Sequence, residues 1–495
     1  MLFSFGVSSI SAQGENDNWY FGNKAAINFS NYPPTAISNS AMNTYEACGS
    51  VSDKNGKLLF YASPEKIWNR QNQPMPNGSL VSYMDTAQQL AIVKNPANDN
   101  QYYVFTTGVN GIINNSYRIS YTIVDMSAGN IGTDGSPLGD VLPRFKQIPV
   151  LDDVGNLFYT EAITIIPHPD GESFWVLIPN DKRLYAYRLD ANGLDNGNPV
   201  ISNLDAQISG NHYGIKVSPR VHGSSFSNYV CISPWADTYV SFSLPDSYFT
   251  NLIYSFDATA GKITSDFSLH VNALRTYSAE FNKDASVLFL GAKDIYAVDL
   301  NNSNSSSVQS MMIYDDPQPY NMGTGMAIQR NILGDIYVSR NFELHLAQIT
   351  KPNVYGPSIG VDLNAIHLGG ASTTSGLPQI IPMLDQSDGY RFGVNSLALT
   401  PKNSKNQKGM VLNLDMEERK SLNNQIDIHP NPASTFVNIN SGNEKITSWQ
   451  LFDISGKNVL NGTSNQVNVQ GLPKAMYLLK ININNKITTK KVIVK

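Results

Sequence analysis

A strand pattern repeats along residues 19–349, and no other feature of the chain restricts its fold as strongly. Each unit has a short apolar strand, a polar turn, an aromatic strand, a second turn and a third strand. The aromatic strand occurs at residues 19–22, 58–61, 102–105, 174–177, 229–232, 287–290 and 336–339. Tyr20 and Tyr337 are 317 residues apart over six steps, or about 53 residues per unit. Repeats of this length predict a β-propeller in which each unit forms one blade.

The strands on either side of the aromatic strand define how the ring closes. The third strand is expected at residues 25–29, 117–124, 184–189, 239–242, 295–300 and 344–349. The leading strand is expected at residues 47–51, 91–93, 162–166, 214–217, 278–281 and 325–328. Because the first aromatic strand has no leader, we expect a segment within residues 360–400 to complete that blade, with Val394–Leu399 as one candidate. The alternative is an open double sandwich of similar strands. The long Gly-containing insertion at residues 125–160 is predicted to be a loop on one face.

Composition fits a strand-and-turn protein. Charged residues make up 15% of the chain and hydrophobic residues 41%, while 54 Asn, 36 Gly and 25 Tyr supply turns and strands. The net charge of -5 excludes a basic nucleic-acid-binding protein, and no apolar run is long enough for a transmembrane helix. The charge is divided unevenly, because residues 426–495 carry +5 and the first 425 residues carry -10. This asymmetry indicates two modules with different partners.

The ends of the chain resemble processing segments. Residues 1–13 resemble the end of a signal peptide that is cleaved near Ala12, although a mildly apolar arm is the alternative. Residues 14–401 are predicted to form the propeller, and residues 402–425 a polar linker.

Short motifs in the body resemble a family of large secreted Bacteroidota proteins known as WYFG-type β-propeller proteins. The motifs are Trp19–Phe29, Thr44–Cys48, Asn55–Tyr61, Met75–Gly78, Tyr102–Thr106 and Gly376–Ile381. Ala26 and Ala47 stand where this family pattern has Gly. The resemblance implies an exported propeller and no particular activity.

Residues 426–495 resemble a type A C-terminal sorting domain of the type IX (Por) secretion system. An opening Ile428–Ala433 motif, a strand–Gly–strand segment at residues 449–459 and a basic end at residues 490–495 occur in the family's order. Alternating short strands over this length predict a small β-sandwich. The resemblance implies that the translocon reads this domain and that it is removed by proteolysis in or near the linker. The sorting residues carried over are Pro430, Asn431, Pro432, Gly456, Lys457, Tyr477, Lys490, Lys491 and Val492.

Motifs for catalysis and cofactors are scarce. The chain has no G-x-S-x-G, H-E-x-x-H, Walker or C-x-x-C motif, so no cofactor is expected. The oxygen-rich loop with Asp190, Asn192 and Asp195 is a candidate calcium site, with a plain hairpin turn as the alternative. The remaining candidates are a zinc pair, a set of carboxylates, a possible disulfide and aromatic residues for sugar stacking. The zinc pair is His212 and His222, and the carboxylates are Glu46, Asp53 and Glu161. The disulfide would join Cys48 and Cys231, with two buried free thiols as the alternative. The aromatic residues are Trp68, Trp235, Tyr320 and Tyr355.

The functional expectation is a non-enzymatic binding or scaffold protein at the cell surface or outside the cell, with a glycan or another envelope protein as ligand. The alternatives are an extracellular polysaccharide hydrolase or lyase with its site at the propeller centre, and an accessory of gliding or secretion machinery. Carboxylates with perturbed pKa values in the central funnel would favour the enzyme. Amides, tyrosine and hydroxyls there would favour binding.

Overall fold

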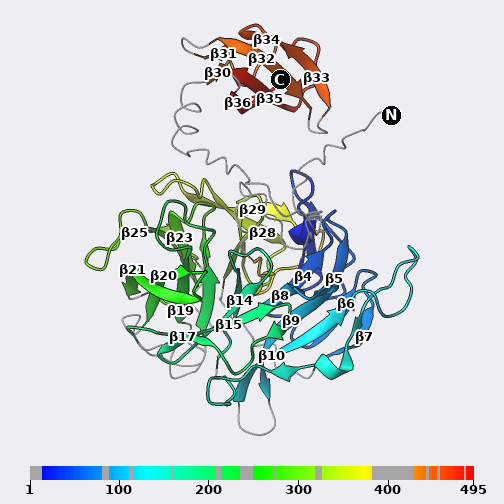
Figure 1. The fold of residues 1–495 in the computed structure, drawn as a ribbon, viewed down its shortest axis with the longest axis vertical. Coiled ribbons are helices and arrows are strands. Elements are labelled where there is room, and N and C mark those ends of the chain that lie inside the picture. Colours follow the sequence, from blue (N-terminus) through cyan, green and yellow to red (C-terminus); the bar gives the residue numbers. More distant parts are fainter. Residues whose placement is uncertain are drawn as a thin grey trace, which may run out of the picture. The chain divides into compact units, whose positions relative to one another are not determined.

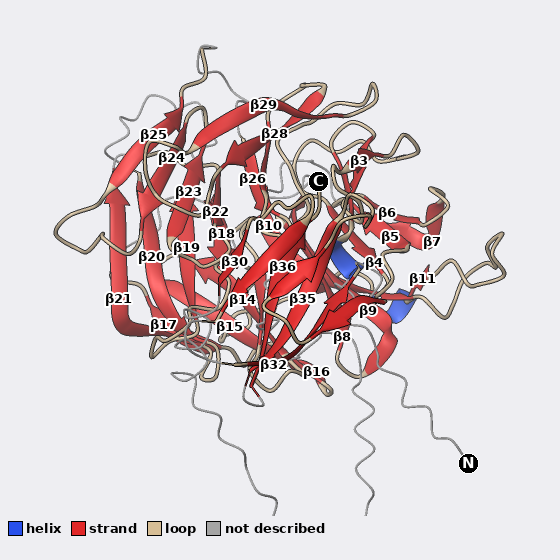
Figure 2. Ribbon diagram, turned by 90° about the horizontal axis from the view of Figure 1, so that it is seen from above, coloured by secondary structure: helices blue, strands red, loops and turns tan. Residues whose placement is uncertain are grey.

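The described part of the chain falls into two compact units, which are presented separately. The computed structural model describes residues 14–80, 89–110, 116–158, 160–206, 213–234, 249–272, 274–317 and 326–381 of the first unit. In the second unit it describes residues 427–441, 445–453, 457–483 and 486–495. The predicted signal remnant (1–13) and linker (402–425) lie outside these ranges. Helical structure among the described residues is limited to two short 3-10 helices, η1 (Gly14–Asn16) and η2 (Pro143–Phe145) (Figure 2).

Seven antiparallel sheets follow one another along the described part of the first unit, each made of strands that are consecutive in sequence. In chain order they comprise β1–β3 (Asn18–Phe21, Ala25–Asn28, Thr35–Ala36); β4–β7 (Gly49–Ser52, Leu58–Ala62, Lys66–Asn69, Pro74–Ser79); β8–β12 (Leu90–Asn95, Asn98–Asn110, Ser116–Asp125, Asp140–Val141, Ile148–Pro149); β13–β17 (Thr164–Pro167, Phe174–Asn180, Arg183–Asp190, Gly193–Leu194, Val200–Asn203); β18–β21 (Tyr213–Val217, Asn228–Pro234, Thr250–Asp257, Lys262–Asn272); β22–β25 (Ser278–Phe281, Val287–Gly291, Ile295–Asp299, Ser310–Tyr314); and β26–β29 (Ala327–Arg330, Ile336–Ser339, His345–Thr350, Gly360–His367). We call these sheets blades 1 to 7.

The first strands of successive blades form the inner ring. Strand β1 lies beside β4, and β4, β8, β13, β18 and β22 each lie beside the next strand of a series that ends with β26. The colour order in Figure 1 runs from the blue strands of blade 2 through cyan and green to the yellow β29, which lies beside β3 of blade 1. Consecutive sheets that meet through their first strands form a seven-bladed β-propeller. The fold prediction is confirmed, and the six expected leading strands each overlap one of β4, β8, β13, β18, β22 and β26.

The ring closes through a segment after β29, which we call the tail (residues 372–381). The backbone N–H of Asn23 donates to the carbonyl of Ser372 at 2.9 Å, and the Ser375 N–H donates to the Tyr45 carbonyl at 2.9 Å. A Cβ atom on Gly376 would lie 1.4 Å from the Glu46 carbonyl oxygen, so only glycine allows this approach. The tail lies within the predicted region 360–400, whereas the candidate strand Val394–Leu399 lies outside the described residues.

Two local predictions in blades 3 and 5 were wrong. The third strand of blade 5 is β20 (Thr250–Asp257) rather than residues 239–242, because β18 and β20 occupy both sides of β19. Residues 239–242 lie outside the described ranges. The insertion at 125–160 contains β11 and β12, which both pair with β10, so it supplies the outer edge of blade 3 rather than only a loop.

Aromatic residues pack between the blades. The ring of Tyr61 stacks on Tyr20 of blade 1 at 4.3 Å between centroids and on Trp68 at 5.3 Å. Each such pair contributes about 0.5–1.5 kcal/mol beyond the burial of its surface. Trp68 lies in β6 and is only 7% exposed, so it belongs to the core and the prediction that it stacks on sugar was wrong. Trp235 and Tyr320 lie outside the described residues, and Tyr355 packs against the core between blades 6 and 7.

The second unit is a small β-sandwich, as predicted. One sheet has the order β30–β31–β34 and the other β33–β32–β35–β36. Their strands are β30 (Asp427–His429), β31 (Phe436–Asn440), β32 (Ile446–Phe452), β33 (Asn458–Gly462), β34 (Gln466–Asn468), β35 (Met476–Ile483) and β36 (Lys486–Ile493). One hydrophobic cluster joins both sheets and includes Val437, Leu451 and Leu479. Across both units, none of the helices in the described residues is long and apolar enough to cross a membrane.

Candidate ligand-binding site

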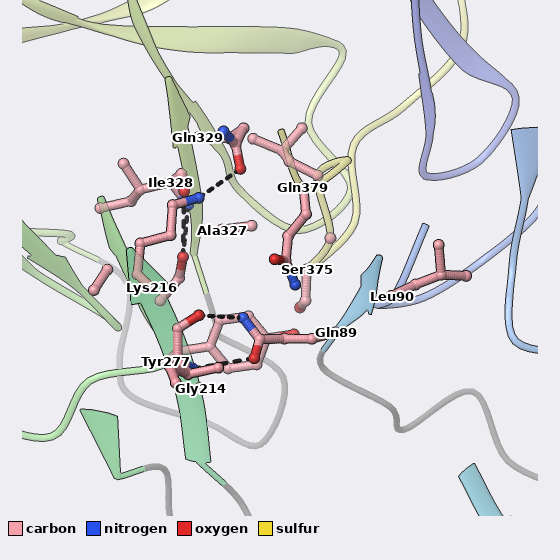
Figure 3. A pocket seen from close by; sticks show the side chains of 15 residues that line it. Gln89, Leu90, Gly214, Lys216, Tyr277, Ala327, Ile328, Gln329, Ser375 and Gln379 are labelled. Carbon is pink, nitrogen blue, oxygen red and sulfur yellow. Dashed lines mark hydrogen bonds between the residues drawn. The ribbon is translucent and has the colours of Figure 1, made fainter. Parts of the chain in front are cut away.

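The propeller centre contains a small polar cavity, which we call the central cavity. It has a volume of about 50 Å³ and is lined by the inner strands β8, β18, β22 and β26 together with residues 375–379 of the tail. Figure 3 shows the polar side chains that meet there, with Gln89, Lys216, Gln329 and Gln379 among those labelled. The volume holds one or a few water molecules, whereas ligand pockets generally have about 300–1,000 Å³.

The amides at the centre bind the backbone of neighbouring blades. The Gln89 side chain donates to the Ile215 carbonyl at 2.8 Å and accepts from the N–H groups of Ile215 and Ile163 at 3.0 and 3.1 Å. The Gln379 amide donates to the Ile163 carbonyl at 2.9 Å and accepts from the Thr164 hydroxyl at 3.0 Å. Gln89 therefore joins blades 3, 4 and 5, and Gln379 attaches the tail to blade 4.

A buried ion pair joins blades 5, 6 and 7 at the same centre. Lys216 Nζ lies 2.8 Å from Glu280 Oε2 and donates to Gln329 Oε1 at 2.6 Å. Glu280 is fully buried, and its carboxylate also accepts from the backbone N–H of Phe281 and of Arg330 at 2.9 Å. Burial lowers the pKa of Lys216, while Glu280 acts in the opposite direction. Such a cluster is stable only while every charge keeps its partners.

The fold brings two of the three candidate carboxylates together. Glu46 and Glu161 both lie near Tyr277, whose pKa is raised well above 10 by burial first, and then by the charge of Glu46, a hydrogen bond to it and the charge of Glu161. Tyr277 lines the central cavity, but the lining contains neither carboxylate. Asp53 lies elsewhere, in the β4–β5 turn, where its Oδ1 accepts from the N–H groups of Asn55 and Lys57 at 2.8 and 3.0 Å.

A second and larger cavity lies between blades 2 and 3, and we call it the interblade cavity. Its volume is about 390 Å³, within the range of small-molecule sites. The apolar part of its wall comes from five blade strands, the residue that follows β10 and the tail. These residues are Val51, Leu59, Ile92, Val93, Tyr102, Met126, Phe174 and Ile381. Gln379 lines both cavities, so the tail forms a wall of each.

Charged groups line the rest of the interblade cavity. They are Glu15 of η1, Asp53 and Lys54 of the β4–β5 turn, Lys94 of β8 and Asp99 of β9. Lys94 Nζ pairs with Asp99 Oδ1 at 2.9 Å. The Oε2 atom of Glu15 is buried and accepts no hydrogen bond from the residues that the structure describes. The cavity thus combines an apolar wall with a few charged groups, the pattern of a small-molecule site.

Burial shifts the acid groups around η1. It raises the pKa of Glu15, and Asp17 and Asp53 raise it further, while the Glu15 backbone N–H and Lys94 lower it. Burial also raises the pKa of Asp17 to about 6. The pKa of Tyr102 lies above its usual 10, chiefly because of burial and then because of the nearby carboxylates.

The predicted calcium loop connects β15 to β17, and oxygens of its Asp side chains accept hydrogen bonds from other groups of the loop. Asp190 Oδ1 accepts from the Asn192 N–H at 2.7 Å, and Asp195 Oδ1 accepts from the Asn198 amide at 3.3 Å. Within the described ranges, no three His, Cys, Asp or Glu side chains gather as a metal site. Calcium binding at this loop stays a prediction.

The other predicted residues are placed as follows. Cys48 and Cys231 are both buried and form no disulfide with each other, so the disulfide alternative was wrong. Burial raises the pKa of Cys231 to about 12. His222 is exposed, and His212 lies outside the described residues. The described ranges therefore do not test the zinc pair.

The sorting residues join the two ends of the sandwich. Asn431, which lies between Pro430 and Pro432, accepts a hydrogen bond at its Oδ1 from the Ile493 N–H at 2.8 Å. Ala433 forms a parallel β-bridge with Val494. The opening motif therefore contacts the end of the chain. The buried Tyr477 donates to the Pro473 carbonyl at 2.8 Å, and in the register of β35 and β36 it faces the buried Val492. Lys490 and Lys491 lie opposite Leu479 and Leu478 in that register. The Lys457 N–H donates to Asp453 at 3.0 Å, while Gly456 lies outside the described residues. Their roles in sorting stay predictions.

No sequence motif indicates the interblade cavity. Glu15, Lys94 and Asp99 belong to no motif, and they meet only because η1 packs on the β4–β5 turn beside blade 3. A Cβ atom on Gly14 would lie 2.0 Å from the Gly56 nitrogen, which is the available sequence signal for this contact: two glycines at a close backbone approach.

Comparisons with known proteins identify the second unit. Residues 427–495 match the family described as secretion system C-terminal sorting domain. They are therefore a type IX sorting domain, which directs the chain to export, and the WYFG-type assignment of the body stays a resemblance. A search of curated proteins finds no match.

Solved structures similar to the body are distant. Two are described as a "putative 6-phosphogluconolactonase". The one from Bacteroides uniformis has 11% identity, 71% coverage of this chain and 98% of its own, and a TM-score of 0.37. The one from Bacteroides fragilis has 11% identity, 74% and 98% coverage and a TM-score of 0.38. The dihydro-heme d1 dehydrogenase NirN has 12% identity, 70% and 72% coverage and a TM-score of 0.35. The propeller assignment rests on the sheet topology and not on these similarities.

Proposed function

We propose that this chain, exported through its type IX sorting domain, is a non-enzymatic binding propeller at the cell surface or outside the cell. Its ligand site is the interblade cavity. The ligand is a small molecule, or a group of a larger envelope component, that has an apolar part and a polar end. A glycan or an envelope protein remains the predicted source of that group.

The size and lining of the interblade cavity are the observation that carries this proposal. Its volume of about 390 Å³ accommodates a ligand, whereas the central cavity of about 50 Å³ has no room for a sugar ring. The polar part of the central lining is made of amides, hydroxyls, Tyr277 and a lysine, and the amides of Gln89 and Gln379 already bind backbone groups. This lining supports binding over the polysaccharide hydrolase or lyase expected at the propeller centre.

A blocking substitution tests the site. Leu59 is half-buried and lines the interblade cavity, so Leu59→Trp would fill it with an indole ring. Amphipathic fragments, screened by ligand-observed NMR against the full-length protein, should show saturable binding that Leu59→Trp removes. Leu333→Trp is the matched control, because Leu333 lies in the β26–β27 turn and is 55% exposed. Fragments that bind equally well to the Leu59→Trp protein would place the ligand site elsewhere.

Export is tested separately by removing residues 427–495. The truncated chain should accumulate in the periplasm, because the sorting domain is then missing. Surface proteolysis and immunoblots of cell fractions measure this. Normal surface delivery of the truncated chain would contradict the role of the sorting domain.

A further inference from the structure

The most informative group in the interblade cavity is the carboxylate of Glu15. This residue lies in η1, lines the cavity, and its Oε2 atom is buried without a hydrogen bond from the described residues. A buried carboxylate oxygen without a donor has lost its hydrogen bonds to water, and no protein hydrogen bond compensates for this loss. Because Glu15 also lines the cavity, a ligand that brings a positive charge and N–H donors to its carboxylate group would stabilise the buried charge.

The net charge of the groups around Glu15 favours a cation at this position. The lining holds three carboxylates, Glu15, Asp53 and Asp99, and two ammonium groups, Lys54 and Lys94, for a net charge of -1. Lys94 is already paired with Asp99 at 2.9 Å. Asp17, next to η1, adds a further carboxyl group that raises the pKa of Glu15. An anionic ligand end would meet an excess of negative charge here, whereas a cationic end is attracted.

The opposite wall suits an apolar stem. Leu59, Ile92 and Met126 present aliphatic or thioether groups, and Tyr102 and Phe174 present rings. Apolar surface that leaves water against such a wall contributes favourable free energy in proportion to its area. Charge at one end and apolar surface at the other define an amphipathic ligand.

We propose that the interblade cavity binds a primary amine carried on an apolar aliphatic or aromatic stem, with the ammonium group on the Glu15 carboxylate. This assignment rests on the proposed function and specifies its ligand class. The ammonium donates a charge-assisted hydrogen bond to the Glu15 carboxylate, which is stronger than a bond between neutral groups.

The affinity should depend on pH. The charged and titratable groups around Glu15 are Lys94 from β8, Asp53 and Lys54 from the β4–β5 turn, Asp99 and Tyr102 from β9, and Asp17 from its own segment. The backbone N–H of Glu15 also donates to its carboxylate. Because burial raises the pKa of Glu15, a larger fraction of its carboxyl group is protonated in mildly acidic solution than for an exposed Glu. Amine affinity should therefore rise with pH through this ionisation and then level off while the amine stays protonated.

Three probes of matched shape test the inference: 2-phenylethylamine, 2-phenylethanol and phenylacetate. Each is titrated into the full-length protein by isothermal calorimetry. We expect the amine to bind at least tenfold more tightly than the alcohol, and the acid to bind more weakly than either. Glu15→Gln should lower the affinity for the amine by about tenfold while leaving the affinity for the alcohol nearly unchanged. Glu65→Gln, which changes an exposed Glu in the β5–β6 turn outside the cavity lining, should change neither affinity.

The outcomes separate the two proposals. If the alcohol or the acid binds as well as the amine, and Leu59→Trp removes that binding, the amine assignment is overturned and the binding site stands. If none of the three probes binds, both are overturned. The comparison of the three probes uses only the unsubstituted protein, so it decides the question even where Glu15→Gln alters folding.

Discussion

The two cavities of the propeller contain similar kinds of side chain and differ in how those side chains are used. In the central cavity, Gln89 and Gln379 bind backbone groups of other blades, and Lys216 is paired with Glu280. In the interblade cavity, Lys94 is paired with Asp99, whereas Glu15 Oε2 accepts no hydrogen bond from the described residues. The central groups stabilise the closed ring, whereas in the interblade cavity the Glu15 carboxylate remains available to a ligand.

The contrast shows that polar residues at the axis of a propeller need not indicate an active site. The inner strands β8, β18, β22 and β26 and the tail meet there around a narrow space. Polar side chains in that space satisfy backbone groups that would otherwise be buried without partners. Space for a ligand is left instead where two blades diverge from the axis.

The largest expected loss in the free energy of unfolding comes from breaking the central ion pair. Glu280→Ala leaves the Lys216 ammonium buried without its carboxylate and should lower the free energy of unfolding by about 3–5 kcal/mol. Denaturant unfolding followed by tryptophan fluorescence measures this. The double substitution Lys216→Met, Glu280→Leu is the control and should restore much of the loss. A change below about 1 kcal/mol for Glu280→Ala would show that the centre is not held by this pair.

The second largest loss of stability is expected from a substitution in the tail, which lines both cavities. Gly376→Ala places a Cβ atom 1.4 Å from the Glu46 carbonyl oxygen, so the tail must move away from blade 2. We expect a loss of about 3 kcal/mol and faster hydrogen exchange in residues 372–381. Gly360→Ala is the control, because its Cβ would meet only Thr350 Oγ1, at 3.4 Å. Equal behaviour of the two variants would mean that the tail does not close the ring.

Substitution of a central amide should lower the free energy of unfolding by a smaller amount. Gln89→Leu removes three hydrogen bonds and leaves the backbone groups of Ile163 and Ile215 without this partner. The expected loss is about 2 kcal/mol, measured by denaturant unfolding. Ligand binding in the interblade cavity should be unaffected, since Gln89 does not line it. A variant that loses fragment binding while keeping its stability would contradict the division of roles between the two cavities.

The smallest effect is a pH dependence at the edge of the interblade cavity. The pKa of Asp17 is about 6 in the folded chain against 3.8 for the unfolded reference, so folding favours its protonated form. The stability from this group is complete below about pH 3.8 and is lost as the pH rises through about 6. Asp17→Asn should therefore stabilise the protein by about 1 kcal/mol at pH 8, a value reduced for the partial exposure of the carboxyl group.

The same variant at pH 4 supplies the internal control. The stabilisation by Asp17→Asn should nearly vanish there, because Asp17 is then largely protonated in the folded chain. Thermal melting of both proteins at the two pH values measures the difference. A stabilisation that is the same at both values would show that burial of the charge is not its cause.

The repeat and the sorting motif were readable from the sequence because both depend on residues that are close together in the chain. Alternating aromatic and β-branched strands with Asn and Gly turns predicted seven blades, and the six expected leading strands all lie in the inner ring. The prediction failed at residues 239–242, where an aromatic segment has the composition of a strand but β20 occupies the position beside β19. Trp68 was misplaced because composition does not tell whether an aromatic side chain faces the core or the solvent.

What the sequence by itself determined is therefore the set of blades, the need for a C-terminal segment to close them, and the export signal. Only the tertiary structure decided which polar residues are used internally and which face a cavity. Glu15, Lys94, Asp99 and Phe174 come from four different elements, and no spacing in the chain relates them. Closure of the ring brings Gln379 to the centre and Ile381 to the interblade wall. The physical reason is that strand formation follows local sequence, whereas the position of a cavity depends on how whole sheets pack around the axis.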